Sequence, residues 1–307
     1  MGESAAPIVV GIDGSTTDEA TLAWALAEAE SSRRDLRVVY AFLWPASLGA
    51  ASLEGRPLIS DPQDLASSRT IADQVVAHAL DQLKSGQTSV SITGEAIEGS
   101  AVTVLRDESA RASLLVLGSR QAGTLGSVLG SVSAAVAARA HCPTVVLRGP
   151  GGLAGERPAV VVGIDGHDLD AAQTLLAFGF DYASRHGAPL RAVLCWRRDP
   201  LVVTGWRMSA TPPERVEPWL GEALAGWRDR YPDVEVHHLA IREHATAGLV
   251  TESLSQELLV VGTRGRHAIA GTLLGSVSQG VLHHAFCPVA VVPTHESAPS
   301  SEPDSEG

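Results

Sequence analysis

The chain has 307 residues, of which 45% are hydrophobic and 19% are charged, and its formal net charge at pH 7 is −12. This length suits two domains of about 150 residues, each large enough to bury a core. The acidic charge argues against nucleic acid or an anionic membrane as the main partner, although it permits a small anion held at one local site.

The composition also bears on the compartment in which the protein works. No apolar run reaches the length of a membrane span, and the first residues, MGESAAPIVV, lack the basic and apolar regions of a secretory signal. The three cysteines include no CxxC pair, so we expect reduced thiols in a cytoplasmic protein. Cys142 and Cys287 each precede a proline, where we expect small buried side chains at a strand start.

The first half of the chain alternates apolar runs with amphipathic segments. IVVGID at 8–13 predicts a strand, and helical spacing of apolar residues predicts a helix over 17–32 with Ser15 as its N-cap. The elements expected after these are a strand at 36–42, a helix at 65–84, a strand at 89–97, a helix at 101–112, a strand at 114–119, a helix that opens at GSVS, and a strand at 144–147.

Continuous β-branched strands that alternate with helices indicate a parallel sheet covered on both faces. Five such strands predict an α/β, Rossmann-like, doubly wound sheet with the strand order 3-2-1-4-5.

The second half repeats this plan. PIVVGIDGS (7–15) matches AVVVGIDGH (159–167), and LLVLGSR (114–120) matches LLVVGTR (258–264). GSVS occurs twice, and each copy leads to a Cys-Pro and a short apolar run. We therefore predict two tandem domains of one fold, at 1–148 and 159–293. The Gly/Pro-rich segment 149–158 is the expected linker, and the acidic, Ser/Pro-rich segment 294–307 is the expected disordered tail.

A doubly wound sheet binds ligands beyond the carboxyl ends of its strands, where the strand order reverses. Here the reversal falls between the first and fourth strands of each half. The candidate binding residues at these strand ends are Gly11, Ile12, Asp13 and Ser15, then Gly118, Ser119 and Arg120 in the first half, and Gly163, Ile164, Asp165, Gly262, Thr263, Arg264 and Gly265 in the second.

The Gly-Ser pair that opens the next helix is a candidate phosphate site. Glycine lets a ligand approach the backbone closely, and the free N–H groups at a helix start attract anions. Ser276 can also cap this helix, and Arg264 or Arg266 can add positive charge. An aspartate suits a sugar hydroxyl or a ring amine better than a phosphate, because a carboxylate accepts hydrogen bonds. The candidate residues at the two helix starts are Gly130, Ser131, Val132 and Ser133, and Gly275, Ser276, Val277 and Ser278.

These residues give the chain a family resemblance. The second half reads GTRGRHAIAGTLLGS, which resembles the loop G-x2-G-x9-G-[S/T] of nucleotide-binding universal stress proteins, a family with the adenine nucleotide hydrolase-like fold. The resemblance covers about 7–148 and 158–293. It implies ATP as the ligand. It also implies adenine near the first strand and near Ala41 at the end of the second strand, ribose near the strand-one aspartate or the strand-four glycine, and phosphates along the glycine loop. Asp13 is in addition a candidate to hold Mg²⁺ through water.

The two halves depart from this pattern in different ways. The first has Gln121 where the second glycine belongs, and its loop is one residue shorter. The second has His167 in place of Ser15, and we align its Arg242-Glu243-His244 with Ile97-Glu98-Gly99. We expect a nucleotide in both halves.

The sequence contains no convincing catalytic set: it lacks the Walker A motif, the GxSxG elbow and HExxH. The chain is therefore expected to be an ATP-binding stress-response regulator with at most slow ATP hydrolysis. The alternatives are a nucleotide-free scaffold and an adenylating enzyme of the related α/β class, whose SGGxDS-like loop is here GIDGSTTD. The short apolar fifth strands are expected to face each other within the chain, since bare sheet edges are usually covered. A homodimer and further protein partners are also expected.

Overall fold

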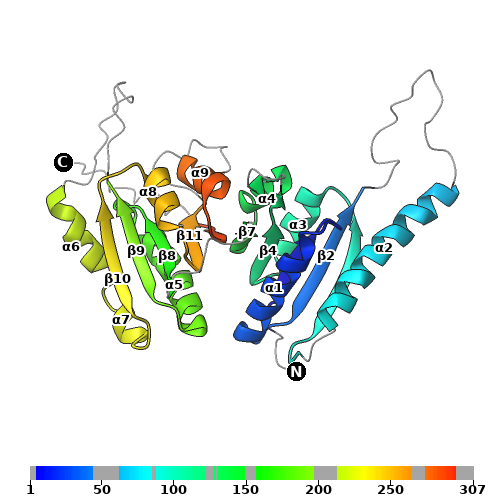
Figure 1. The fold of residues 1–307 in the computed structure, drawn as a ribbon, viewed down its shortest axis with the longest axis horizontal. Coiled ribbons are helices and arrows are strands. Elements are labelled where there is room, and N and C mark those ends of the chain that lie inside the picture. The colour runs from blue at the N-terminus through cyan, green and yellow to red at the C-terminus, as the bar shows by residue number, and fades with distance from the viewer. Residues whose placement is uncertain are drawn as a thin grey trace, which may run out of the picture.

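The computed structural model describes residues 5–43, 62–84, 88–121, 127–128, 130–148, 157–196, 213–263 and 274–294. The described residues form two α/β halves that lie side by side and share one sheet (Figure 1). None of the described helices is both long enough and apolar enough to cross a membrane.

The first half contains the elements that the sequence predicts, in the predicted order. Its bounds are β1 (Ile8–Ile12), α1 (Asp18–Ser32), β2 (Leu36–Phe42), α2 (Pro62–Lys84), β3 (Ile92–Glu98), α3 (Ala101–Ser109), β4 (Leu114–Gly118), β5 (Arg120–Gln121), β6 (Ser127–Val128), α4 (Ser131–Ala137) and β7 (Thr144–Leu147).

The second half repeats the order and replaces one long helix by two shorter ones. Its bounds are β8 (Val160–Ile164), α5 (Leu169–His186), β9 (Leu190–Cys195), α6 (Pro213–Leu224), α7 (Trp227–Arg230), β10 (Val236–Ile241), α8 (Ala245–Glu252), β11 (Leu258–Gly262), α9 (Ser276–His284) and β12 (Val289–Val292).

The ten main strands form a single sheet in the order β10-β9-β8-β11-β12-β7-β4-β1-β2-β3. Read by halves, this is 3-2-1-4-5 twice, with parallel pairing inside each half, so the predicted topology is confirmed. β7 and β12 pair antiparallel at the centre, which confirms that the fifth strands face each other.

Alternate strand residues feed hydrophobic cores on the two faces of the sheet. Ile8 and Val10 pack with Leu22 of α1 on one face, whereas Val9 packs with Leu105 of α3 on the other. The inner strands are therefore buried on both sides, which is why their sequences show continuous apolar runs, whereas the edge strands β3 and β10 are partly exposed.

Glycines in the first strands allow the covering helices to approach closely. A Cβ atom at Gly11 would lie 2.9 Å from the side chain of Leu105 in α3, and one at Gly163 would lie 2.7 Å from that of Leu249 in α8. The two halves thus use the same packing solution at the same position.

The structure corrects three local expectations. The residue that precedes α1 as its N-cap is Thr17 and not Ser15, and the N-cap of α9 is Gly275 and not Ser276. In the first half, part of the glycine loop forms the small antiparallel hairpin β5–β6, which the sequence pattern did not predict. Most of the expected linker and all but the first residue of the expected tail lie outside the described residues.

Candidate functional site

The candidate site lies where the strand order reverses. β1 pairs with β2 on one side and β4 on the other, so the carboxyl ends of β1 and β4 meet at one edge of the sheet. β8 and β11 meet in the same way in the second half. Those predicted residues at these strand ends that lie in the described part of the chain are brought together as the topology requires.

Two carboxylates organise the turn after β1. Asp18 at the start of α1 accepts the Gly14 N–H through Oδ2 at 2.8 Å, and its Oδ1 lies 3.4 Å from the Asp13 nitrogen. Asp13 in turn accepts the Ser15 N–H at 3.0 Å, and the Ser15 hydroxyl is 2.8 Å from that of Thr17. Asp13 and Ser15 remain exposed, so the turn presents a carboxylate and a hydroxyl at the sheet edge.

Asp18 was missed by the sequence reasoning. Its signal is present in the repeat, because GIDGSTTD and GIDGHDLD both end in aspartate, at Asp18 and Asp170. Partial burial, followed by the negative charge of Asp13, raises the pKa of Asp18 to about 6. Any cation bound at this turn would lower that pKa, because it favours the charged carboxylate.

The helices α4 and α9 start at this same edge. Gly130 and Gly275 are their N-caps in extended conformation, and neither cap has a side chain to occupy the first N–H groups of its helix. Ser131 and Ser276, the first helical residues, are exposed. The geometry needed for an anion at a helix start is therefore built in both halves.

The hydroxyls of Ser133 and Ser278 bond within the protein, although both residues were candidate ligand residues. The Ser133 hydroxyl donates to the Gly118 carbonyl at 2.8 Å, and the Ser278 hydroxyl donates to the Gly262 carbonyl. Both side chains are buried. They tie each helix start to the end of the neighbouring strand, so only their backbone N–H groups are available to a ligand.

Ser119 and Thr263 also connect the site to the sheet. Both are buried, and their N–H groups donate to the last residues of the adjacent fifth strands, Leu147 and Val292. The Thr263 carbonyl accepts the Gly275 N–H at 2.8 Å, which positions the cap of α9. Ser119 and Thr263 therefore shape the site rather than line it.

Other predicted residues line the core side of the site. Ile12 and Ile164 are buried in the main hydrophobic cluster, and Val132 and Val277 are half-buried against the cores on the other face. Asp165 follows β8 as Asp13 follows β1, and it is half-buried. Arg120 is described only by its backbone in β5, and Arg264, Gly265 and Arg266 lie outside the described residues.

A pocket of about 350 Å³ opens at the end of β2, beside Ala41. It is lined by Tyr40, Ala41, Phe42, Leu43, Ser68, Ile71, Ala72, Gly99 and Ala101. The mixture of apolar side chains and exposed backbone suits a flat aromatic group.

Both halves place an arginine over an aromatic ring at this end of the sheet, and in the first half Arg69 lies 5.8 Å from the centre of the Phe42 ring. Ala41 pairs with Ile97 and Cys195 pairs with Ile241, so Arg242-Glu243-His244 match Glu98-Gly99-Ser100. This corrects the sequence alignment by one residue. The Arg242 guanidinium carbon lies 5.4 Å from the centre of the Trp196 ring, so an aromatic residue and a cation stand at this end of the second half.

The described residues offer little for redox or metal chemistry. They hold no cluster of three or more His, Cys, Asp or Glu side chains with metal-binding geometry. Cys142 and Cys287 are buried before β7 and β12 as predicted, and burial raises the pKa of both thiols to about 12. Thiols in that state are poor nucleophiles.

Comparison with known proteins agrees with this architecture. The Universal stress protein family profile matches residues 5–148 and 157–293. Universal stress protein Rv2005c of Mycobacterium tuberculosis is 34% identical over 299 residues, which cover 92% of this chain and 96% of that protein. Universal stress protein Rv2623 of the same organism is 34% identical over 306 residues, covering 94% and 97%.

Among solved structures, a universal stress protein from Archaeoglobus fulgidus shares the fold, with a TM-score of 0.67, 15% identity, and coverage of 95% of this chain and 97% of that one. Shorter proteins that align with about half of this chain include a universal stress protein solved in complex with cAMP (23% identity, coverage 47% and 98%, TM-score 0.34). Another, from Archaeoglobus fulgidus, was solved with dAMP (18% identity, coverage 47% and 98%, TM-score 0.32). Those two proteins bind adenine nucleotides.

Proposed function

We propose that this chain, which belongs to the universal stress protein family, is an ATP-binding regulatory protein of the cytoplasm with one nucleotide site in each half. The observation that carries the proposal is a convergence at the sheet edge. A helix start capped only by glycine stands beside an aspartate turn, at the reversal of strand order, in both halves. Each feature alone is common; together they make a site for a phosphorylated ligand.

The parts of the nucleotide are assigned to residues by their chemistry. Phosphates bind the N–H groups at the start of α9 and α4, with Arg264 or Arg266 adding charge in the second half. The ribose hydroxyls donate to Asp13 and Asp165, because carboxylates are acceptors. In the first half, the adenine ring enters the pocket at Ala41, and Mg²⁺ is held by the Asp13–Asp18 pair through water.

ATP acts in this proposal as a stabilising ligand that controls contacts with partner proteins. Hydrolysis, where it occurs, is slow, since no lysine of a Walker A motif reaches the terminal phosphate. Two chains form a homodimer. Because β7 and β12 already pair inside the chain, the second copy binds at another surface. Light scattering is then expected to give twice the chain mass of 31.9 kDa at micromolar concentration; the mass of one chain would remove the dimer from the proposal.

Calorimetric titration of nucleotide-free protein with ATP and Mg²⁺ tests the proposal. We expect two ATP molecules per chain. Gly275→Glu places a negative charge at the start of α9 and is expected to abolish the second site, because a side-chain carboxylate competes with phosphate for the same N–H groups. Gly130→Glu is expected to do the same in the first half, where a Cβ atom finds its nearest contact at 3.7 Å.

A matched control is Gly221→Glu in α6, where no atom lies within 4 Å of an added Cβ atom and the charge is remote from both sites. This variant is expected to keep two sites. Wild-type protein that binds no ATP, and whose thermal midpoint does not move at millimolar ATP, would leave the nucleotide-free scaffold as the function.

A further inference from the structure

Among the described residues, two of the contacts between the halves differ in kind. One is the antiparallel ladder between β7 and β12 at the centre of the sheet, and the other joins α1 of the first half to α5 of the second (Figure 1). The ladder is made by backbone groups, whereas the contact between α1 and α5 is made by side chains.

The ladder does not distinguish one half from the other. β7 reads TVVL and β12 reads VAVV, and all eight side chains are buried. Their pairing, for example Val289 with Val146, uses backbone groups that every strand carries. Either strand would pair as well with a second copy of itself.

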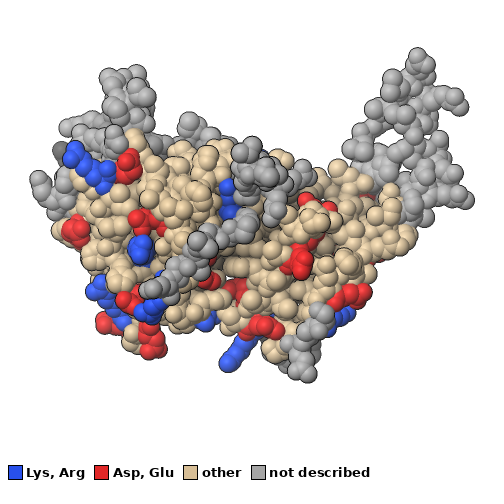
Figure 2. Space-filling view, viewed as in Figure 1, with Lys and Arg blue, Asp and Glu red and all other residues tan. Residues whose placement is uncertain are grey.

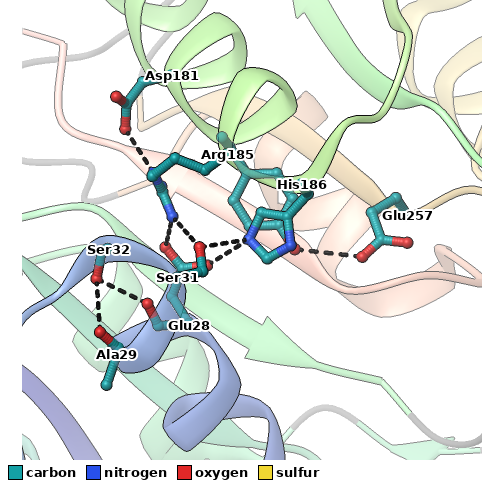
Figure 3. A network of polar contacts seen from close by, with 9 residues as sticks. Glu28, Ala29, Ser31, Ser32, Asp181, Arg185, His186 and Glu257 are labelled. Carbon is teal, nitrogen blue, oxygen red and sulfur yellow. Dashed lines mark hydrogen bonds and ion pairs between the residues drawn. The ribbon is translucent and has the colours of Figure 1, made fainter. Parts of the chain in front are cut away.

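The helix contact is centred on one buried acid. Glu28 of α1 is 3% exposed, and its two oxygens lie 2.6 Å from Arg185 Nη1 and 2.8 Å from His186 Nε2, both at the end of α5 (Figure 3). Arg185 also donates to Ser31 at 3.0 Å and to Asp181 at 3.1 Å. Burial alone lowers the pKa of Arg185, but the charges of Glu28 and Asp181 outweigh it and raise that pKa.

Aromatic rings extend this contact. Tyr182 stacks on Trp24 of the first half at a centroid distance of 6.4 Å, and on His186 at 4.1 Å. Its hydroxyl donates to Glu257 at 3.4 Å. The contact between α1 and α5 thus includes stacked rings as well as paired charges.

The pseudo-twofold symmetry identifies which residues correspond. The C-cap residue is Arg33 in α1 and Gly187 in α5. Both adopt the left-handed conformation, and both stand three residues before the first residue of the next strand. Counting back from these positions, Glu28 corresponds to Tyr182, Ser31 to Arg185, and Ser32 to His186. The first half therefore carries the buried carboxylate of Glu28, and the second half carries Arg185 and His186, which pair with it.

We propose that the α1–α5 contact is a pairing surface that makes the first half select a second half and reject another copy of itself. In a pair of first halves, Ser31 and Ser32 would stand where Arg185 and His186 now hold Glu28. Each Glu28 would then be buried without a cation, which is costly. In a pair of second halves, the bases of each helix would face Tyr182 instead of a carboxylate. Specificity here comes from this penalty on the wrong pairs.

Arg148, just after β7, adds a separate asymmetry that disfavours pairs of second halves. It reaches across to the end of α9 and donates to the carbonyls of Leu282, His283 and Ala285. The corresponding residue after β12 is Pro293, which has no side-chain donor. A pair of second halves would lose this contact twice.

The selection can be tested on folded full-length protein that carries a protease site between Arg148 and Arg157. The cut protein is dissociated in mild denaturant and dialysed, so that the halves pair anew, and native mass spectrometry counts the pairs. We expect at least tenfold more mixed pairs than like pairs. Glu28→Arg is expected to lower this ratio at least tenfold, whereas the control Glu30→Arg, at an exposed position of the same helix, leaves it unchanged.

A random mixture of pairs from the wild type, separated halves, or equal ratios for the two Arg variants would overturn the proposal. The uncut chain provides a second measurement at pH 8. Glu28→Arg and Arg185→Glu are each expected to lower the folding equilibrium constant at least tenfold, and the double variant is expected to recover at least tenfold of that loss. Recovery of less than twofold would contradict a specific charge pairing.

Discussion

The two halves of this chain share their strand order and differ in the helices that cover the sheet. In both, an arginine of the second strand pairs with a glutamate of the helix that precedes the fourth strand: Arg37 with Glu108 at 2.7 Å, and Arg191 with Glu252 at 2.8 Å. In both, a serine at the end of that helix accepts the N–H of the residue just before the Cys-Pro of its half. Contacts that hold the sheet and its helices together are thus duplicated, even where they are made by polar groups.

The largest difference lies in the layer that covers the second and third strands. The first half uses the single helix α2, whereas the second uses α6 and α7, whose Trp227 stacks on Phe180 of α5 at 5.2 Å, with Tyr231 at 5.5 Å from the same ring. The residue of α1 that corresponds to Phe180 is Leu26, which is half-buried. The second half therefore depends on an aromatic cluster that the first half does without.

Replacing Phe180 and Leu26 by alanine is expected to give the largest difference in stability between corresponding positions of the two halves. Phe180 is completely buried, so Phe180→Ala is expected to lower the free energy of unfolding by about 4 kcal/mol. Leu26→Ala is expected to cost about 1–2 kcal/mol, because less apolar surface is lost from a half-exposed site. Urea unfolding followed by circular dichroism measures both. Equal losses would show that the aromatic layer contributes nothing special to the second half.

The turn after β1 leads to a smaller, pH-dependent effect. The pKa of Asp18 is raised from 3.8 to about 6, so between these values the folded chain keeps a proton that the unfolded chain releases. The contribution of Asp18 to the free energy of unfolding therefore falls as pH rises from about 4 to about 6, and is constant above that.

Asp18→Asn is expected to remove this fall, which we place at about 1 kcal/mol after allowing for solvent screening of a partly exposed group. The measurement is the urea midpoint of variant and wild type across pH 3.5–8. A wild-type slope that survives the substitution would assign the effect to other groups.

The smallest expected effect concerns the two helix ends. Arg33 adopts a left-handed conformation, with φ of 54°, where the second half has Gly187 at 62°. Arg33→Gly relieves this strain and is expected to stabilise the chain by about 0.5–1 kcal/mol, whereas Gly187→Ala is expected to destabilise it by a similar amount. Thermal midpoints report both changes, and a loss of stability in Arg33→Gly would mean that the arginine side chain outweighs its backbone strain.

The inner strands of the sheet were predictable from the sequence because they are buried on both faces. Continuous apolar runs bounded by polar residues placed strands 36–42 and 144–147 at the observed limits, and the repeat required both halves to follow one topology. The candidate binding edge followed from topology as well, since the place where strand order reverses depends only on the order of the strands.

Local hydrogen bonding and contacts between halves were not predictable in this way. The choice of Thr17 over Ser15 as the N-cap depends on how two carboxylates fold the turn around their neighbours. The partner of Glu28 lies 157 residues away in the sequence, so helical periodicity shows only that a glutamate sits on α1. Ser133 and Ser278 were candidates because of their N–H groups at a helix start, and that position does not determine the direction of their hydroxyls.

The pairing of β7 with β12 also has a consequence during synthesis, because β7 stays unpaired until β12 has been made. β12 is the last strand in the described part of the chain, and roughly 140 residues separate it from β7. At a synthesis rate of about 5–20 residues per second, a completed first half would expose the backbone of β7 for about 7–30 s before its partner leaves the ribosome. During that interval an open, apolar sheet edge is available to other nascent chains. This protein pairs a strand of its first half with a strand that is made much later, so the edge of β7 has to be shielded while translation continues.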